Sequence, residues 1–385
     1  MALSTESLAA GLSALSAARA ATDEIFQLVQ PGCLYDRPIP ERHRVIFYVG
    51  HVEAFDWNLL ARREFNLAPF HANFDRLFAF GIDPGPDGLP TDQYSDWPEH
   101  AAVLDYVQRC RRKIDDLWEE TPEQLRWVSL EHRLMHAETL AYMLHNFPLS
   151  KLVRPHGYNP ETSTSEVKAS FVQIPAGSAT LGQSREGGFG WDNEYDQHTV
   201  DVPAFSIGKY KITNGEYLEF VGTGAPAPHF WVRRDGQWYL RCMFAEIPLP
   251  MNWPVYVTQE QALAYATWRG LRLPTEPEWH RASAASTALK GNFGMRRWDP
   301  EPVTELQLSG NGWEWTSTIF GPFPGFRPFA FYAGYSADFF DGAHYVLKGA
   351  SPRTAAPFLR PSFRNWFRPD YPYVYAGFRC VEPGR

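Results

Sequence analysis

The first 150 residues repeat apolar positions with the period of a helix. Apolar side chains recur at spacings of three and four residues, for example at Leu130, Leu134, Ala137 and Ala141. The pattern predicts four helices, near residues 5–30, 41–66, 98–119 and 123–147. Four helices of this length favour a four-helix bundle, a fold that can hold a metal site between its facing helices.

The pattern changes beyond residue 168. Short strand-like runs such as 171–174 alternate with Gly, Pro and Asn turns, and one strong helix is predicted near 258–269. Residues 151–168 contain Pro155, Gly157, Pro160 and a Ser/Thr cluster, which indicates a linker. The sequence therefore predicts two domains, a helical one at 1–150 and an irregular α+β domain at 169–385.

Composition narrows the function classes. The chain of 385 residues has a formal charge of −8, and it has no long basic run that could neutralise nucleic-acid phosphates. No apolar run approaches the length that spans a membrane, and residues 1–20 favour an amphipathic helix over a signal peptide. The four cysteines show no pairing pattern and indicate reduced thiols in a cytoplasmic protein.

The fourth predicted helix carries a pair of histidines, His132 and His136. Residues four apart share one helical face, so the two imidazoles can approach one metal ion, although most such pairs are surface or packing residues. Arg133 stands where a zinc metalloprotease needs a glutamate, which argues against that chemistry. Glu138 lies about 200° around the helix from His136, so the third ligand must come from elsewhere. His51, on the second predicted helix, is the best candidate.

Several phrases of the α+β region occur together in a characteristic order. They are Thr-Leu-Gly at 180–182, Asp-Asn-Glu at 192–194, Lys-Ile-Thr-Asn-Gly-Glu-Tyr at 211–217, Leu-Arg-Leu-Pro-Thr-Glu-Pro-Glu-Trp at 271–279, Gly-Trp-Glu-Trp-Thr at 312–316 and Gly-Phe-Arg-Cys at 377–380. Together they resemble the formylglycine-generating-enzyme-like domain, whose fold is related to C-type lectins. The His-x3-His-x-Glu phrase at 132–138 resembles the DinB-like helical bundle. Joined in this order, the two domains resemble the non-haem iron sulfoxide synthases of ergothioneine biosynthesis.

That resemblance implies an Fe(II) ion held by His51, His132 and His136. Three imidazoles on one face of an octahedral ion leave the other positions open for substrates and O2. In this family the iron binds the imidazole of hercynine (trimethylhistidine) and a sulfur or selenium nucleophile. Oxygen then drives formation of a bond between the chalcogen and the imidazole carbon.

Two further phrases match residues that act on hercynine in the family. The phrase at 363–366 resembles the hercynine contact, with Asn365 and Trp366 matching, and aromatic faces are natural partners of a quaternary ammonium group. Tyr332 and Tyr335 resemble the family's catalytic Tyr-x-x-Tyr, whose first tyrosine supplies a proton during oxygen activation. The alternative for Trp366 is a core aromatic, and the alternative for the two tyrosines is loop packing.

The sequence departs from the enzymes that use γ-glutamylcysteine. Those enzymes share two features. Arginines in the loop after the second helix bind the carboxylates of γ-glutamylcysteine, and an acidic residue follows the Asn-Trp pair. Here residues 83–97 contain no Arg or Lys, and Phe367 follows Trp366. A cation-free loop is a poor receptor for a peptide with two carboxylates, although Arg364 and Arg368 could supply cations from elsewhere.

A neutral nucleophile rich in hydroxyl groups fits this loop better. The loop carries polar side chains that can form hydrogen bonds with sugar hydroxyls, namely Asp83, Asp87, Asp92 and Gln93. The alternative is that these side chains only face solvent. The phrase at 51–57 also resembles the family's selenoneine branch, which couples hercynine to a selenosugar. The prediction is therefore C–Se bond formation with a selenosugar. The alternative is a sulfoxide synthase that uses cysteine, γ-glutamylcysteine or a thiosugar.

Two other function classes fit less well. A formylglycine-generating enzyme binds copper with two nearby cysteines, whereas Cys380 stands far from the preceding Cys242 in the sequence. A non-catalytic sugar-binding module would not need a set of three histidines.

Overall fold

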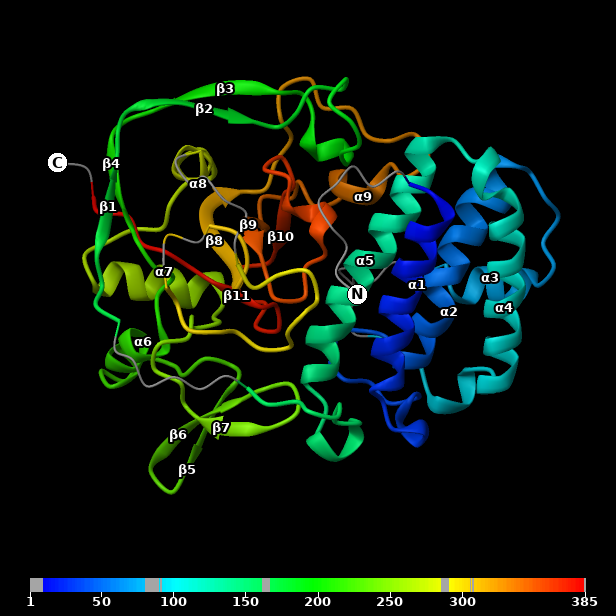
Figure 1. Ribbon diagram of the computed structural model, residues 1–385, viewed down its shortest axis with the longest axis horizontal. Coiled ribbons are helices and arrows are strands. Elements are labelled where there is room, and N and C mark those ends of the chain that lie inside the picture. Colours follow the sequence, from blue (N-terminus) through cyan, green and yellow to red (C-terminus); the bar gives the residue numbers. More distant parts are fainter. Residues whose placement is uncertain are drawn as a thin grey trace. The chain divides into compact units, whose positions relative to one another are not determined.

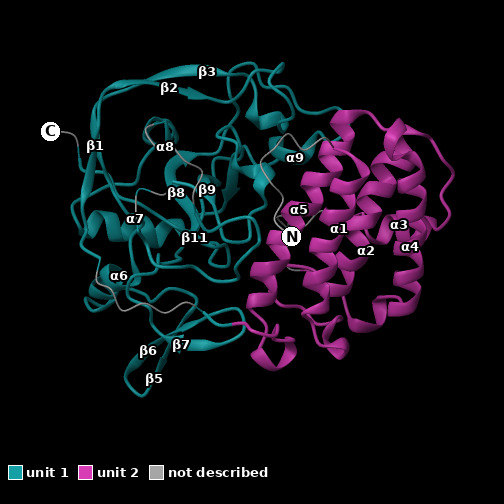
Figure 2. Cartoon of the chain, in the orientation of Figure 1, with its two compact units in different colours: residues 1–3, 159–385 teal, residues 4–158 magenta. Residues whose placement is uncertain are grey.

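Helices occupy the first part of the chain, and strands appear only in the remainder of what is described (Figure 1). The computed structural model describes residues 10–79, 90, 92–160, 167–284, 291–304, 306 and 308–383. The chain divides after residue 158 into two compact units (Figure 2). We call the described residues up to 158 the helical unit and those from 159 onward the α+β unit. The predicted α+β class, with N-terminal helices, is confirmed.

All four predicted helices are present in the helical unit and lie side by side (Figure 1). They are α1 (Leu12–Gln27), α2 (Val45–Asp56), α4 (His100–Leu117) and α5 (Glu123–His145). The structure adds a short helix that the sequence did not predict, α3 (Ala72–Leu77), and a π-helical continuation of α2 at Trp57–Glu64. Short 3-10 turns lie at Pro31–Cys33, Tyr94–Asp96, Trp118–Glu120 and Leu149–Lys151.

Helix α2 is covered by its neighbours on every side. All of its residues except Phe55 are buried, and α5 is buried along most of its length. A helix that is buried all round belongs to the interior of its domain, not to its surface. Because His51 lies on α2 and His132 and His136 lie on α5, burial of these two helices takes all three imidazoles out of water.

The helical unit extends past the predicted domain end at residue 150. The chain from 151 to 153 returns to the end of α1, where Val29 and Leu152 form an antiparallel bridge. The backbone N–H of Val153 donates to the carbonyl of Leu28 at 2.7 Å, and the N–H of Gln30 donates to the carbonyl of Lys151 at 2.9 Å. The first residues of the predicted linker at 151–168 are thereby tied to the helical unit.

The described residues of the α+β unit form four small sheets. The largest has the strand order β10-β9-β8-β11 and is antiparallel except for the β11–β8 pair. Its strands are β8 (Gly312–Ile319), β9 (Tyr345–Ala350), β10 (Asn365–Phe367) and β11 (Ala376–Gly377). Pairs join β1 (Phe171–Ile174) to β4 (Phe205–Gly208) and β2 (Gly177–Leu181) to β3 (His198–Val202), and a three-stranded sheet joins β5 (Trp231–Arg234), β6 (Gln237–Arg241) and β7 (Glu246–Pro248).

The helix predicted near 258–269 is present as α7 (Gln259–Trp268), but the sequence missed further helices of the α+β unit. Besides α7, the structure has α6 (Asn214–Val221), α8 (Glu276–Ser283) and the short α9 (Gly334–Ala337). Helices α6 and α8 each begin with a Thr-x-x-Glu capping box, in which side chain and backbone satisfy each other's hydrogen bonds. The apolar periodicity over eight residues is too short to detect, but the two capping boxes were visible in the sequence.

Buried ion pairs accompany the aromatic core of the α+β unit. Glu314 on β8 accepts hydrogen bonds from Lys211 at 2.6 Å and Arg379 at 3.0 Å, and all three side chains are almost fully buried. Trp313 and Trp315 on the same strand are also buried. These contacts fix the sheet on which β10 presents Asn365, Trp366 and Phe367.

Among the described helices, none combines the length and the hydropathy that crossing a membrane requires.

Candidate metal centre and aromatic cluster

Three imidazoles meet inside the helical unit. The Nε2 atom of His136 lies 3.2 Å from Nε2 of His51 and 3.2 Å from Nε2 of His132. Each side chain offers one ligand atom, and these atoms all lie within 4.8 Å of one another. The structure therefore brings together His51 and the His132–His136 pair, as the sequence predicted, from two helices.

The spacing of the nitrogens fits a shared metal ion. Imidazole nitrogens bind an ion such as Zn²⁺ at about 2.0–2.1 Å, so two ligands at 90° to 109° lie roughly 2.8–3.4 Å apart. The two observed Nε2 separations of 3.2 Å fall within this range. Three nitrogen ligands without a carboxylate leave the remaining positions of an octahedral ion open to small molecules.

The surroundings of His51 favour the neutral, metal-binding tautomer. Its Nδ1 lies 2.7 Å from the carbonyl oxygen of Phe78, which can only accept, so Nδ1 carries the hydrogen and Nε2 keeps its lone pair. Burial lowers the pKa of His51 to about 4. Gly50 permits this contact, since a Cβ there would lie 2.6 Å from the Phe78 ring.

The other two imidazoles are also neutral. Burial lowers the pKa of His132 and of His136 well below its usual range, and the neighbouring imidazoles lower both further. Neutral imidazole is the form that binds a metal ion. Their Nδ1 atoms are buried without a hydrogen-bond partner among the described residues, so Nε2 is the atom that faces the shared centre.

Aromatic rings flank the histidines. Phe55 stacks on His132 with ring centroids 3.5 Å apart and an interplanar angle of 10°. Phe47 stacks on His51 at 4.8 Å and 23°. Packing of this kind restricts rotation of the imidazoles and keeps the centre in an apolar environment.

A second cluster, in the α+β unit, gathers the predicted substrate and proton-donor residues. The ring of Trp366 on β10 lies 5.5 Å from that of Tyr335, and Tyr335 lies 5.5 Å from Tyr332. Phe320 stacks on Trp366 at 4.2 Å and 7°, and Trp191 stacks on Tyr335 at 3.9 Å and 20°. We call these five rings the aromatic cluster. Sequence reasoning missed Trp191 and Phe320 as members of it.

Asp192 holds the tyrosine segment. Its carboxylate accepts a hydrogen bond from Ser336 Oγ at 2.5 Å and another from the backbone N–H of Phe329 at 3.3 Å. These bonds tie both ends of the segment that carries Tyr332 and Tyr335. Asp192 belongs to the Asp-Asn-Glu phrase of the sequence, which was a signal for the family but not for this contact.

The residues on either side of Asn365 and Trp366 have partners within the α+β unit. Arg364 is 2% exposed and pairs with Glu276 through Nε–Oε1 at 3.0 Å and Nη2–Oε2 at 3.1 Å. Its charge is therefore compensated inside the domain. Phe367 stacks on Tyr371 at 5.1 Å and 11°.

The loop at 83–97 contains no Arg or Lys, but two arginines from an earlier segment of the chain contact its described part. Arg37 and Arg44 both pair with Asp92, and the Arg44 Nε–Asp92 Oδ2 distance is 2.8 Å. Trp97 Nε1 donates to the same carboxylate at 2.7 Å. The inference that this region lacks cations was wrong, because the arginines come from an earlier segment of the chain. The other candidate carboxylates, Asp83 and Asp87, lie outside the described residues.

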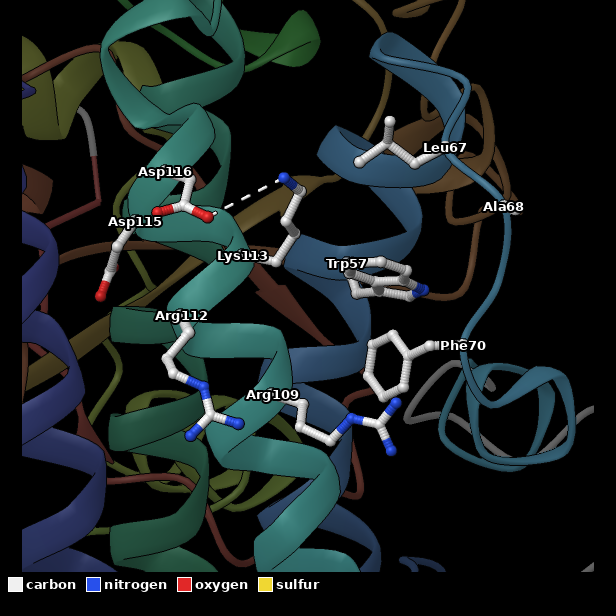
Figure 3. Close-up of a pocket in the computed structure, with 9 residues that line it drawn as sticks. All are labelled: Trp57, Leu67, Ala68, Phe70, Arg109, Arg112, Lys113, Asp115 and Asp116. Carbon is white, nitrogen blue, oxygen red and sulfur yellow. Dashed lines mark ion pairs between the residues drawn. The ribbon is translucent and has the colours of Figure 1, made fainter.

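A pocket of about 710 Å³ lies on the helical unit but does not include the three histidines. Its walls combine α4 with the segment after α2, and Figure 3 shows Arg109 beside Phe70, with the guanidinium 4.3 Å from the ring centroid. Lys113 pairs with Asp116 at 3.8 Å, and Asp115 pairs with Arg19 at 2.5 Å. The pocket is separate from the three imidazoles, and several of its lining charges already have ion-pair partners, so the pocket is not the candidate site.

Comparison with known proteins gives the family. A family model described as the sulfatase-modifying factor enzyme 1-like domain matches residues 158–303 and 297–383. The hercynine oxygenase of Mycolicibacterium smegmatis is 32% identical over 321 residues, which are 70% of this chain and 74% of that protein. The chain belongs to the sulfatase-modifying factor enzyme 1-like family and shares it with this hercynine oxygenase.

Other relatives align with different shares of this chain. Ergothioneine biosynthesis protein 1 of Schizosaccharomyces pombe is 30% identical over 417 residues, which are 92% of this chain and 54% of that protein. The chain thus spans about half the length of that relative. The formylglycine-generating enzyme of Thermomonospora curvata is 29% identical over 194 residues, which are 42% of this chain and 62% of that protein.

Proposed function

We propose that this protein is an Fe(II)- and O2-dependent enzyme that joins a sulfur nucleophile to the imidazole of hercynine, as an ergothioneine-type sulfoxide synthase. The observation that carries the proposal is the convergence of three buried, neutral imidazoles from α2 and α5. The similarity to a hercynine oxygenase and to an ergothioneine biosynthesis protein supports hercynine as the substrate. Bound Fe(II) would supply the activation of O2 and a coordination site for each substrate.

The helical unit, which the sequence suggests is DinB-like, holds the iron in this proposal. His51, His132 and His136 donate Nε2 lone pairs, and the carbonyl of Phe78 keeps His51 in the required tautomer. The stacked rings of Phe47 and Phe55 limit rotation of two ligands. The unit thus supplies a rigid ligand set, not a proton donor.

The aromatic cluster of the α+β unit supplies the hercynine and proton-transfer functions. Trp366 offers a ring face to the trimethylammonium group, and Asn365 offers an amide to the polar part of hercynine. Tyr332 donates a proton from its hydroxyl group. Tyr335 packs against the ring of Tyr332 and holds that ring in place. The role we propose for Arg364 is indirect, because its pairing with Glu276 anchors the start of β10. Phe367 borders the site as an apolar residue.

The second candidate is coupling of hercynine to a selenosugar, as in selenoneine formation. Three sequence observations favour it. They are the lack of Arg and Lys at 83–97, the apolar Phe367 after the Asn-Trp pair, and the resemblance of the phrase at 51–57 to the selenoneine branch. The pairing of Arg37 and Arg44 with Asp92 weakens the first of them, since it brings cations to the loop. The similarity to an ergothioneine biosynthesis protein favours sulfur, because ergothioneine is a sulfur compound, so the sulfur reaction is the lead proposal.

A competition assay separates the candidates. The Fe(II) protein receives hercynine and O2 with equal amounts of cysteine, γ-glutamylcysteine, a thiosugar and a selenosugar, and the products are quantified by mass spectrometry. We expect a sulfur product to dominate. A dominant selenium product would transfer the assignment to the selenosugar reaction, and the absence of any hercynine-derived product would overturn the proposal.

A further inference from the structure

Five alternating charges run through the helical unit next to the three histidines. They are Asp23 on α1, Arg111 on α4, Glu53 on α2, Arg133 on α5 and Asp56 on α2. Arg111 contacts both oxygens of Asp23 at 2.7 Å, and its Nε donates to Glu53 Oε1 at 2.7 Å. Arg133 donates to both oxygens of Glu53 at 2.9 Å and to Asp56 Oδ2 at 2.8 Å. We call these residues the charge chain; it links all four long helices.

The central pair of the charge chain is buried completely. The side chains of Arg133 and Glu53 are both 0% exposed. A buried ion pair adds little net stability, because removing two charges from water costs about as much as their attraction returns. A planar guanidinium that contacts both carboxylate oxygens fixes distance and orientation, which a single point contact does not. The fixed geometry of the Arg133–Glu53 pair is therefore a better reason for its presence than any gain in stability.

The pair joins the two backbone segments that carry the candidate ligands. Arg133 directly follows His132 on α5, and Glu53 lies two residues after His51 on α2. Arg133 Nη2 also donates at 2.9 Å to the carbonyl of Val52, the residue next to His51. A slip of one helical turn would move the ligands by about 5.4 Å, far more than the 3.2 Å between their Nε2 atoms.

We infer that Arg133 and Glu53 are positioning residues of the three-histidine metal centre, and that their ion pair sets the register of α2 against α5. Within the described part of the chain, their side chains bond to one another and to the remaining charge chain and the Val52 carbonyl, not to an imidazole. They act through the backbone that carries His51 and His132. The inference rests on the metal centre proposed above.

Two substitutions separate positioning from a simple effect of charge. Glu53→Gln leaves the Arg133 cation less compensated, and its field would weaken binding of a divalent cation. Arg133→Met leaves the Glu53 carboxylate less compensated, and its field would strengthen binding. Loss of helix register weakens binding in both variants. Opposite signs therefore indicate a field effect, and equal signs indicate positioning.

The measurement is the dissociation constant of Co(II) for the metal-free full chain, by calorimetry and visible absorption. We expect Glu53→Gln and Arg133→Met each to weaken Co(II) binding by roughly 10- to 100-fold, the range typical of residues that orient metal ligands. An unchanged constant in either folded variant, or changes of opposite sign, would overturn the inference.

A milder variant covers the case in which these two do not fold. Arg133→Lys keeps the charge but cannot contact both carboxylate oxygens in one plane. We expect it to fold and to weaken Co(II) binding by roughly 3- to 10-fold, below the range of the full substitutions. If Arg133→Lys binds Co(II) like the parent protein, the register of the helices does not depend on this pair.

Matched controls distinguish this inference from the proposal on which it rests. Glu314→Gln removes the charge of an equally buried carboxylate in the α+β unit, so thermal stability should fall while the Co(II) constant stays unchanged. His132→Ala removes a ligand itself. If His132→Ala retains full Co(II) affinity, the metal centre is wrong; if it loses affinity while the Arg133 and Glu53 variants do not, only the positioning role is wrong.

Discussion

The two units present their candidate residues in different ways. In the helical unit the three histidines stand on long helices and are 2% to 4% exposed. In the α+β unit Trp366 lies on a three-residue strand, Tyr332 lies in a turn, and both are half-buried. A metal centre needs fixed ligands, whereas a substrate must reach its contacts from solvent. The comparison shows that the candidate metal ligands are buried on long helices, whereas the candidate substrate contacts are partly exposed on short segments.

The two sites also differ in how far apart in the sequence the residues that hold them lie. Helix periodicity relates His132 to His136 over four residues, and one packing contact between α2 and α5 completes the set. The aromatic cluster depends on contacts such as Asp192–Ser336, which join residues 144 positions apart. A substitution in the helical unit should therefore act on metal binding, and one in the α+β unit should act on substrate or turnover.

The largest expected effect is that of His132→Ala on metal retention. One of three ligands disappears, so Co(II) binding should weaken by more than the roughly 100-fold that marks the upper range for outer-shell partners. Metal titration of the purified variant gives the value. His145→Ala, on the same helix but outside the three-histidine group, is the control and should bind normally. Equal binding by both variants would break the assignment of a rigid site to the helical unit.

Tyr332→Phe should lower turnover without loss of metal. The substitution removes only the hydroxyl group, and general acid catalysis contributes about 10²- to 10⁴-fold to a rate. Single-turnover kinetics with hercynine, together with metal content, tests this. Tyr335→Phe should cost less, because Tyr335 is buried beneath Trp191, whereas Tyr332 is half-exposed. An unchanged rate in Tyr332→Phe would reduce the tyrosine to a packing residue.

Gly50→Ala tests how closely α2 approaches the end of α3. The added Cβ would lie 2.6 Å from the ring of Phe78, whose carbonyl holds His51. Overpacking of this kind costs about 1–3 kcal/mol of unfolding free energy, and Co(II) affinity should fall with it. Denaturant unfolding and metal titration measure the two effects. Lower stability with full metal affinity would show that the Phe78 contact does not orient His51.

The smallest effect is expected for Trp366→Leu, in hercynine affinity alone. A cation–π contact contributes about 0.5–2 kcal/mol, so the dissociation constant should rise roughly 2- to 30-fold. Histidine, whose α-amino nitrogen carries no methyl groups, serves as the comparison ligand, and its affinity should fall less. Equal losses for hercynine and histidine would place Trp366 among the core aromatics, as its stacking on Phe320 also allows.

Much of the fold and of the candidate metal centre could be predicted from local patterns in the sequence. Apolar periodicity identified the four long helices, which have 12 to 23 residues. Helices α6 and α8 escaped because eight residues carry too little of that signal. The i, i+4 histidine pair is a local property of one helix. The choice of His51 as third ligand needed only that a second helix pack against the first.

Other features depended on contacts between distant parts of the chain. The segment at 92–97 contains no cation in its own sequence, yet Arg37 and Arg44 reach Asp92 in the folded chain. Trp191 and Phe320 join Tyr335 and Trp366 from segments that no short-range pattern connects to them.

The sequence by itself supplied the candidate residues: the histidine pair from residue type and helical spacing, and His51, the Tyr-x-x-Tyr pair and the Asn-Trp phrase with the help of a family resemblance. Residue type and helical spacing are local, so they can be read along the chain. Only the tertiary structure decided which charges are already paired, as for Arg133 with Glu53 and Arg364 with Glu276. The physical reason is that a charge is compensated by whatever lies within a few ångströms in space, and folding brings together residues that are 80 or more positions apart.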